Sequence, residues 1–248
     1  MNCGKIKKAC FIASSGGHWE ELMCLREIAD AYDTFFVTEE GGQAEDSNLK
    51  KIYTLPQINR HEKRFFFHFF KLFKSALKIL KKEKPDFVLF WDKDILLAKF
   101  LENQKIPVYN SSEAIRICDD KRLTYLALQE NKLPIPQTIF APMTYSTIGF
   151  NQYDFLHAVE EKLTYPFVAK EAFGSFGEQV YLVQNREELL AVMKQSDSVE
   201  FLFQEMIENS TGRDVRLQVV GDEVAASMYR YSEHDFRANI TAGGKMKD

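Results

Sequence analysis

The first 110 residues alternate between short apolar runs and amphipathic segments, and this order restricts the fold more than any other feature of the sequence. The run "KKACFIAS" predicts a buried strand, the glycines after it a turn, and "HWEELMCLREIADAY" an amphipathic helix. Further strands are expected at "TFFVT", "KKIYTLP", "KPDFVLFW" and "IPVYN", with a helix over "KDILLAKFLENQK". Because such alternation favours a parallel sheet covered by helices, we expect an α/β fold with a Rossmann-like N-terminal half.

Composition and charge indicate an ordinary globular protein. The 248 residues are 45% hydrophobic, which suffices for one large domain or two small ones, and the formal net charge is -4. This charge balance argues against a nucleic-acid partner. The four cysteines lie far apart without a CxxC pair, so we expect neither a disulfide framework nor a zinc site, and a reducing cytoplasm fits best.

Residues 64–82, "RFFFHFFKLFKSALKILKK", are strongly apolar, yet they place polar groups at steps of three and four. This spacing puts the polar groups on one helical face, so the helix is unsuited to cross a membrane. Two alternatives stay open. The helix packs on the sheet with its lysines in water, or it makes peripheral contact with the inner membrane surface. The polar residues of the stripe are Arg64, His68, Lys71, Ser75, Lys78 and Lys82.

A second domain of α+β type is expected over residues 111–248, after a first domain of residues 1–110. The stretch "NSSEAIRICDDKRLTYLALQENKLPIPQTIFAP" predicts two helices and an extended segment. Further helices are expected at 151–163 and 186–195. Strands are expected at 165–170, 178–183, 200–207, 214–220 and 223–230, several of them antiparallel neighbours.

The stretch "VAKEAFGSFGEQVYLV" predicts two strands joined by a glycine loop, with Lys170 just before it. Gly174 and Gly177 would let backbone N–H groups approach phosphate oxygens, and Lys170 would supply positive charge. The P-loop pattern GxxxxGK[ST] is absent, and a surface hairpin with a solvated lysine is the alternative.

Charged and polar residues downstream strengthen the case for an anionic ligand. Arginines on apolar strands are costly unless an anionic group meets them, although each could pair with a neighbouring carboxylate. Together they predict a site for several negative charges. They are Glu205, Asp214, Arg216, Arg230, Arg237 and Asn239, all expected on strands or strand ends.

The segment from about residue 90 to residue 248 resembles the ATP-grasp carboxylate–amine ligases of the RimK type. The motifs that carry this resemblance are "NSSEAIRICDDKRLT", "PIPQT", "YPFVAKEAFGSFGEQVYLV", "FQEMIENSTGRDVRLQVVGDEVAASMYR" and "DFRANITAGG". The resemblance implies that ATP lies between two α+β subdomains and that a substrate carboxylate attacks its γ-phosphate. An amine then captures the acyl-phosphate, while magnesium and arginines neutralise developing charge. Small-molecule or peptide carboxylates and amines would be the substrates.

The resemblance also assigns roles to residues. Lys170 and Lys121 would meet the phosphates, and the loop with Gly174, Ser175 and Gly177 would act as a lid. Catalytic roles fall to Arg230 and Arg237. The remaining ATP-binding residues would be Glu205 and Met206 at the adenine, Asp214 at the nucleotide, and Arg237, Ala238 and Asn239 at the phosphates or the acyl-phosphate.

Members of that family place their magnesium ligands after the equivalent of Gly244, as an aspartate on one strand and a Glu-x-Asn pair on another. This sequence shows no matching motif up to Asp248, so we expect no metal ligand within it. The expectation is an ATP-grasp module lacking its C-terminal part, with weakened nucleotide affinity and absent or very low turnover.

Residues 1–89 resemble the membrane-anchoring subunit of two-component UDP-sugar glycosyltransferases of bacterial polysaccharide assembly. The resemblance rests on "CFIASSGGHWEELMCLREIADAYDTFFVTEEGGQ" and "KIYTLPQINR", and it implies a catalytic glycosyltransferase partner. A plain strand-to-helix turn also explains Gly16 and Gly17. Three hypotheses therefore stay open: a ligase module with this half as its front domain, a tethering subunit, and a fusion remnant without activity.

Overall fold

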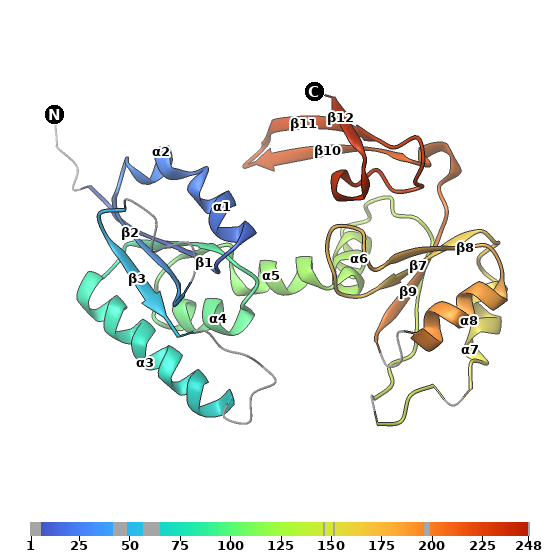
Figure 1. The fold of residues 1–248 in the computed structure, drawn as a ribbon, viewed down its shortest axis with the longest axis horizontal. Helices are drawn as coiled ribbons and strands as arrows, with labels where there is room; N and C mark the ends of the chain where they lie inside the picture. Colours follow the sequence, from blue (N-terminus) through green and yellow to red (C-terminus); the bar gives the residue numbers. More distant parts are fainter. Residues whose placement is uncertain are drawn as a thin grey trace. The chain divides into compact units, whose positions relative to one another are not determined.

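The computed structural model describes residues 6–41, 49–56, 65–145, 147–150, 152–195 and 199–247, apart from the side chains of residues 65, 66 and 69. The chain divides into two compact units, Met1–Arg116 (unit 1) and Ile117–Asp248 (unit 2) (Figure 1). The sequence placed its domain boundary at residue 110, just before the helix in which this division falls.

Unit 1 is built around a parallel sheet with the strand order β3-β2-β1-β4-β5. Apolar clusters lie on both faces, one with α3 and α4 and the other with α1. This arrangement confirms the predicted Rossmann-like half. The strands are β1 Lys8–Ala13, β2 Asp33–Glu39, β3 Ile52–Leu55, β4 Phe87–Trp91 and β5 Val108–Tyr109. The helices are α1 Gly17–Met23, α2 Arg26–Ala29, α3 Phe65–Glu83, α4 Ile95–Asn103 and α5 Ser112–Asp119, the last crossing the division.

The prediction of one continuous helix over "HWEELMCLREIADAY" is wrong, because α1 and α2 are separate. The amide of Leu25 donates to the carbonyl of Leu22 at 3.0 Å, three residues back. This tighter turn leaves the α-helical hydrogen-bond pattern and ends α1.

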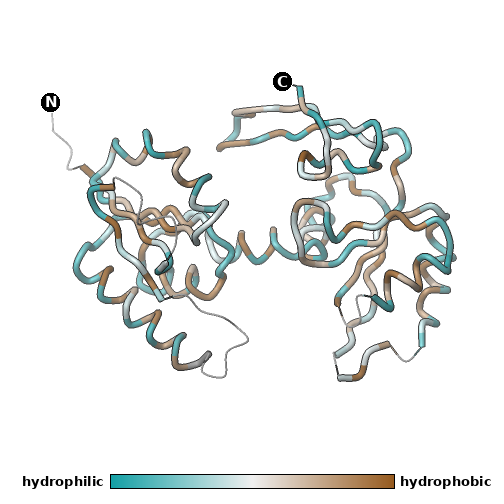
Figure 2. The backbone as a smooth tube through the Cα atoms, in the orientation of Figure 1, coloured by the Kyte–Doolittle hydropathy of each residue, from teal (hydrophilic) through white to brown (hydrophobic). Residues whose placement is uncertain are grey.

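Helix α3 packs on the sheet through its apolar side, as the first of the two alternatives for the lysine-striped segment expects. Leu72, Ala76 and Leu80 are buried in the cluster shared with α4, while Lys71 and Lys78 are exposed. Figure 2 shows hydrophilic and hydrophobic stretches alternating along this helix. Within the described residues, no helix combines the length and apolarity needed to cross a membrane. Arg64 lies outside the described residues.

Unit 2 contains two antiparallel sheets and confirms the predicted α+β architecture. In the sheet β6-β9-β7-β8, one face packs against α7 and α8, as Figure 1 shows. Its elements are α6 Lys121–Glu130, β6 Thr138–Phe140, α7 Phe155–Glu160, β7 Phe167–Glu171, β8 Val180–Val183, α8 Arg186–Gln195 and β9 Phe201–Glu205. The second sheet is β10 Arg213–Val220, β11 Glu223–Tyr231 and β12 Lys245–Lys247, with 3₁₀ helices at Glu208–Ser210 and Ile240–Ala242.

Candidate functional site

Lys170 lies near the end of β7, on the sheet face opposite α7 and α8. Its neighbour Ala169 belongs to the apolar cluster, and alternation along the strand turns Lys170 the other way. Its Nζ donates to Gln204 Oε1 at 2.5 Å and to the hydroxyl of Tyr125 at 3.5 Å. Both acceptors are neutral, and Lys170 forms no ion pair with any described residue. Its positive charge therefore stays available to an anionic ligand.

The glycine loop, residues 172–179, joins β7 to β8 and is held by cations from two distant segments. Lys121, the first residue of α6, places its Nζ 3.1 Å from the carbonyl oxygen of Gly174. Arg237 donates from Nη1 to the carbonyl oxygen of Gly177 at 2.6 Å. Three of the predicted phosphate-binding cations thus contact this loop or the strand that leads into it.

Arg237 is fixed in place by Asp235. Its Nε and Nη2 donate to the two carboxylate oxygens at 3.0 and 2.7 Å. These hydrogen bonds lower the pKa of the Asp235 carboxyl and raise the pKa of Arg237. Both groups therefore stay charged near neutral pH, and the guanidinium is held beside the loop.

Gly177 makes a close approach to Asn239 that a side chain would prevent. Its φ is 82°, and a Cβ there would lie 2.9 Å from Asn239 Oδ1. Ala238, which precedes Asn239 in the chain, is only 4% exposed. The loop and the 237–239 segment therefore form one packed assembly, joined also by a hydrogen bond of 3.1 Å from the Thr241 hydroxyl to the carbonyl of Phe176.

Asp214 and Arg230 face each other across β10 and β11 and form a two-pronged ion pair. The guanidinium donates to the two carboxylate oxygens at 2.7 and 2.6 Å. The predicted catalytic arginine thus has a carboxylate partner, as the sequence alternative allowed. Neither residue hydrogen-bonds or forms an ion pair with Lys170 or the glycine loop within the described part of the chain. Arg216 lies two residues along the same strand, opposite Met228.

The end of β9 carries the two residues assigned to adenine. The Glu205 carboxylate accepts from the amide of Gln137 at 2.7 Å, so it fixes the start of β6. Met206 follows the strand and is half-buried. Its backbone N–H and C=O have no hydrogen-bond partner among the described residues, so they can pair with the edge of a planar base.

Several residues that shape the site were not predicted from the sequence. Gln204 is a polar residue that follows three apolar ones in the strand "FLFQE", and it is only 4% exposed. Asp235 stands two positions before Arg237, and Tyr125 lies one helical turn after Lys121. Both residues could therefore have been predicted from their spacing in the sequence. Ser175, which was predicted, lies in the loop, where its backbone carbonyl accepts from the amide of Glu178 at 3.3 Å.

The described residues hold no group of three or more His, Cys, Asp or Glu side chains that could bind a metal ion. The oxygens of Asp214, one of the acidic residues of the predicted site, already face Arg230.

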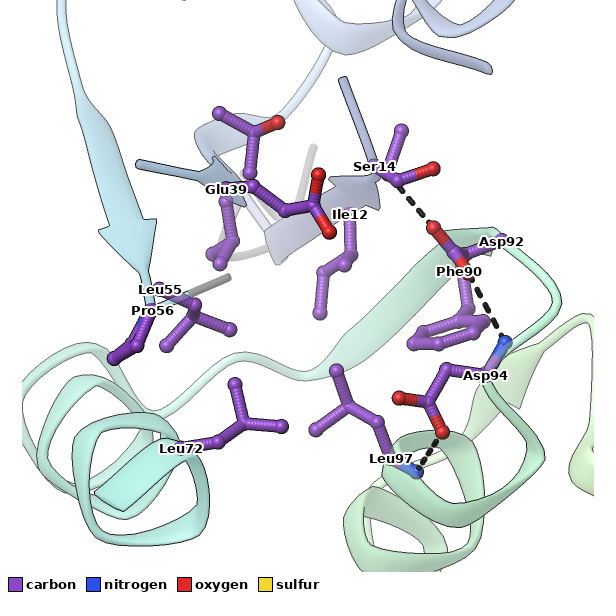
Figure 3. Close-up of a pocket in the computed structure, with 13 residues that line it drawn as sticks. Ile12, Ser14, Glu39, Leu55, Pro56, Leu72, Phe90, Asp92, Asp94 and Leu97 are labelled. Carbon is purple, nitrogen blue, oxygen red and sulfur yellow. Dashed lines mark hydrogen bonds between the residues drawn. The ribbon is translucent and has the colours of Figure 1, made fainter. Parts of the chain in front are cut away.

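Unit 1 contains a separate hollow of about 120 Å³ at the carboxyl ends of its strands (Figure 3). Its floor is apolar, and the carboxylates of Glu39, Asp92 and Asp94 line its rim. Asp92 accepts from the amide of Ser14 at 2.8 Å, so the "SSGGH" turn is already bound to a carboxylate. An acidic rim repels phosphates, and the cationic loop of unit 2 is the better site for an anionic ligand.

Comparison with known proteins identifies the family. Residues 118–248 match the model of the RimK-like ATP-grasp domain. A probable alpha-L-glutamate ligase of Haemophilus ducreyi is 32% identical over 144 residues, covering 57% of this chain and 44% of that protein. The alpha-aminoadipate–LysW ligase LysX of Saccharolobus solfataricus is 31% identical over 159 residues, covering 60% of this chain and 54% of that protein.

The fold is also similar to that of a solved enzyme structure. The structure of N5-carboxyaminoimidazole synthetase from Staphylococcus aureus complexed with ADP matches with a TM-score of 0.64 at 16% identity, over 94% of this chain and 56% of that chain. This likeness concerns the fold and extends over unit 1 as well as unit 2.

The chain spans about half the length of the curated relatives it matches. None of the matches named above supports the resemblance of residues 1–89 to a glycosyltransferase subunit, or a role in polysaccharide assembly. The family model, in contrast, covers more than half of the sequence. The chain therefore belongs to the RimK-like ATP-grasp family.

Proposed function

We propose that unit 2 binds ATP and that the protein acts in ATP-dependent joining of a carboxylate to an amine through an acyl-phosphate. The observation that carries this proposal is the glycine loop, with Lys121 at one end, Arg237 at the other and Lys170 on the strand leading into it. Lys170 donates to two neutral oxygens, of Gln204 and Tyr125, and a charged phosphate oxygen would be a stronger acceptor for its ammonium group.

The same arrangement orients the nucleotide. The phosphates lie at the loop and its cations, and adenine lies at the free backbone groups of Met206. Arg237, with Asp235 behind it, faces the γ-phosphate and the acyl-phosphate formed from it, where charge develops during transfer. Arg230 and Asp214 support the nucleotide from β10 and β11. Magnesium bound with the nucleotide would neutralise charge on its phosphates during transfer.

The relatives' names support a substrate class, because they describe a ligase for glutamate, a ligase for α-aminoadipate and a synthase of β-citrylglutamate. We therefore infer a small amino acid or a peptide as carboxylate donor and an amine as acceptor. Hydroxylamine tests the acyl-phosphate step, because it captures an activated acyl group as a stable hydroxamate. Hydroxamate that forms only with ATP and one carboxylate would identify the donor.

Nucleotide binding is tested by calorimetric titration with MgATP, using two alanine substitutions that differ only in their surroundings. Gly177→Ala and Gly221→Ala both place a side chain at positive φ, 82° and 63°. The first would also drive a Cβ to 2.9 Å from Asn239, whereas the second meets nothing within 4 Å. We expect Gly177→Ala to weaken MgATP binding about tenfold, which is about 1.4 kcal/mol. Gly221→Ala should bind as the unaltered protein does.

A second pair separates the loss of a specific contact from the loss of charge. Lys170→Met should weaken MgATP binding by about ten- to a hundredfold, the value of a hydrogen bond to a charged group. The control Lys162→Met removes an exposed lysine elsewhere in unit 2 and should have no effect. If the unaltered chain shows no binding heat with MgATP, or if both lysine variants bind equally well, the proposed site is wrong.

A further inference from the structure

The outer face of α3 is exposed and combines aromatic with basic side chains. We define this face as Phe67, Phe70, Lys71, Lys74, Lys78 and Lys81, all of which are exposed. Phe67 and Phe70 are 71% and 72% exposed, unusually high values for phenylalanine. Steps of three and four place all six on one side of the helix. The opposite side, with Leu72, Ala76 and Leu80, is committed to the core.

Among the described side chains of α3, no acidic one interrupts this face. The one acidic residue of α3, Glu83, is buried and points to the sheet. The chain as a whole is acidic, with a formal net charge of -4, so the four lysines of the outer face form a local concentration of opposite sign. Lys82 extends the basic character toward β3, where its Nζ lies 5.1 Å from the ring of Tyr53.

We propose that the outer face of α3 docks unit 1 on an anionic lipid surface while α3 remains packed on its sheet. The lysines attract the negative headgroups, and the two phenylalanines at one end of the helix enter the interface between headgroups and acyl chains. Exposed phenylalanines favour lipid over nucleic acid as the partner, because a phosphate backbone alone gives them nothing to bury against. The proposal is independent of nucleotide binding in unit 2.

The test is cosedimentation of the full chain with lipid vesicles. Vesicles of phosphatidylcholine alone are compared with vesicles that also contain phosphatidylglycerol. We expect binding to the anionic vesicles only, and weaker binding as salt is raised. Each lysine near such a surface strengthens partitioning about fivefold, so K71E/K74E/K78E should reduce it by more than about a hundredfold.

A matched control keeps the change of net charge the same. K7E/K162E/K194E alters three exposed lysines outside α3 and should bind anionic vesicles almost as well as the unaltered chain does. F67S/F70S keeps every charge but should reduce binding clearly. Circular dichroism of each variant verifies that the fold is retained.

Four results would overturn the proposal. The first is equal sedimentation with neutral and anionic vesicles, and the second is an equal loss in the two triple variants, which would reveal dependence on net charge alone. The third is an unchanged affinity of F67S/F70S, which would remove insertion and leave a diffuse cationic surface. Stronger binding to a duplex DNA probe than to anionic vesicles would assign the face to a nucleic acid instead.

Discussion

Glu83, at the end of α3, connects the helix to two strands of the parallel sheet and should make unit 1 sensitive to acid. Its carboxylate is 3% exposed and accepts hydrogen bonds from Lys51, from the Tyr53 hydroxyl and, at 3.3 Å, from Lys8. Burial by itself would raise the pKa of Glu83, but these hydrogen bonds outweigh it and lower the pKa to about 2. The ionised form is therefore strongly favoured in the folded state.

The size of the effect follows from this shift. Lowering the pKa from 4.5 to about 2 corresponds to at most about 3 kcal/mol of folding free energy. Lys8 and Lys51 are 27% and 36% exposed, so solvent screening reduces the expected contribution to about 1 to 2 kcal/mol. Because the pKa is lower in the folded state, this stabilisation is complete above pH 4.5 and disappears as the pH falls toward about 2.

The comparison of Glu83 with Glu83→Gln measures the contribution directly. The chain has two tryptophans, Trp19 and Trp91, both in unit 1, so urea unfolding followed by tryptophan fluorescence reports on that unit. Near neutral pH the variant should be less stable by about 1 to 2 kcal/mol. The difference should shrink as the pH falls below 4.5, because protonated Glu83 resembles glutamine. A difference that stays constant across this range would refute the argument.

Substitutions at three further positions test packing, helix capping and charge. Phe203→Ala removes a ring with no exposed surface from the core of unit 2 and should cost about 3 to 5 kcal/mol in chemical denaturation followed by circular dichroism. Asp94→Ala removes the side chain that accepts from two amides at the start of α4, and should lower the unfolding free energy by about 1 kcal/mol, measured by tryptophan fluorescence. Asp94→Asn should retain most of the stability. Gln204→Glu gives Lys170 a charged partner and should weaken MgATP binding about tenfold in calorimetry, while Gln204→Met should not create that competition.

The strands and helices were largely predictable because each depends on short-range patterning. The strand expected at 214–220 is observed at Arg213–Val220, and the helix expected at 186–195 is observed over those residues. The side chains of α3 that pack on the sheet also follow from a period of 3.6 residues. The break at Leu25 was not predictable, because no proline or glycine marks it.

Pairing within the site depends on details that a sequence pattern does not contain. Counting back from the turn, where Val220 lies opposite Glu223, would place Asp214 opposite Tyr229. A bulge between Gln218 and Val219 shifts the register by one residue and brings Arg230 there instead. The contact of Lys170 with Gln204 joins strands 34 residues apart, and the contact of Arg237 with Gly177 spans 60 residues. Both require the tertiary fold.

The glycine loop is held in place by other residues, whereas its glycines alone would suggest a flexible loop. Lys121, Arg237 and Thr241 all donate to loop carbonyls, so the loop is anchored from two sides. These acceptors are neutral, and a phosphate oxygen is a stronger acceptor for a cation than a carbonyl oxygen is. If unit 2 binds ATP as proposed, the cations that hold the loop are the same ones that contact the phosphates. Glycine is required at position 177 because a Cβ there would lie 2.9 Å from Asn239 and 3.4 Å from Arg237.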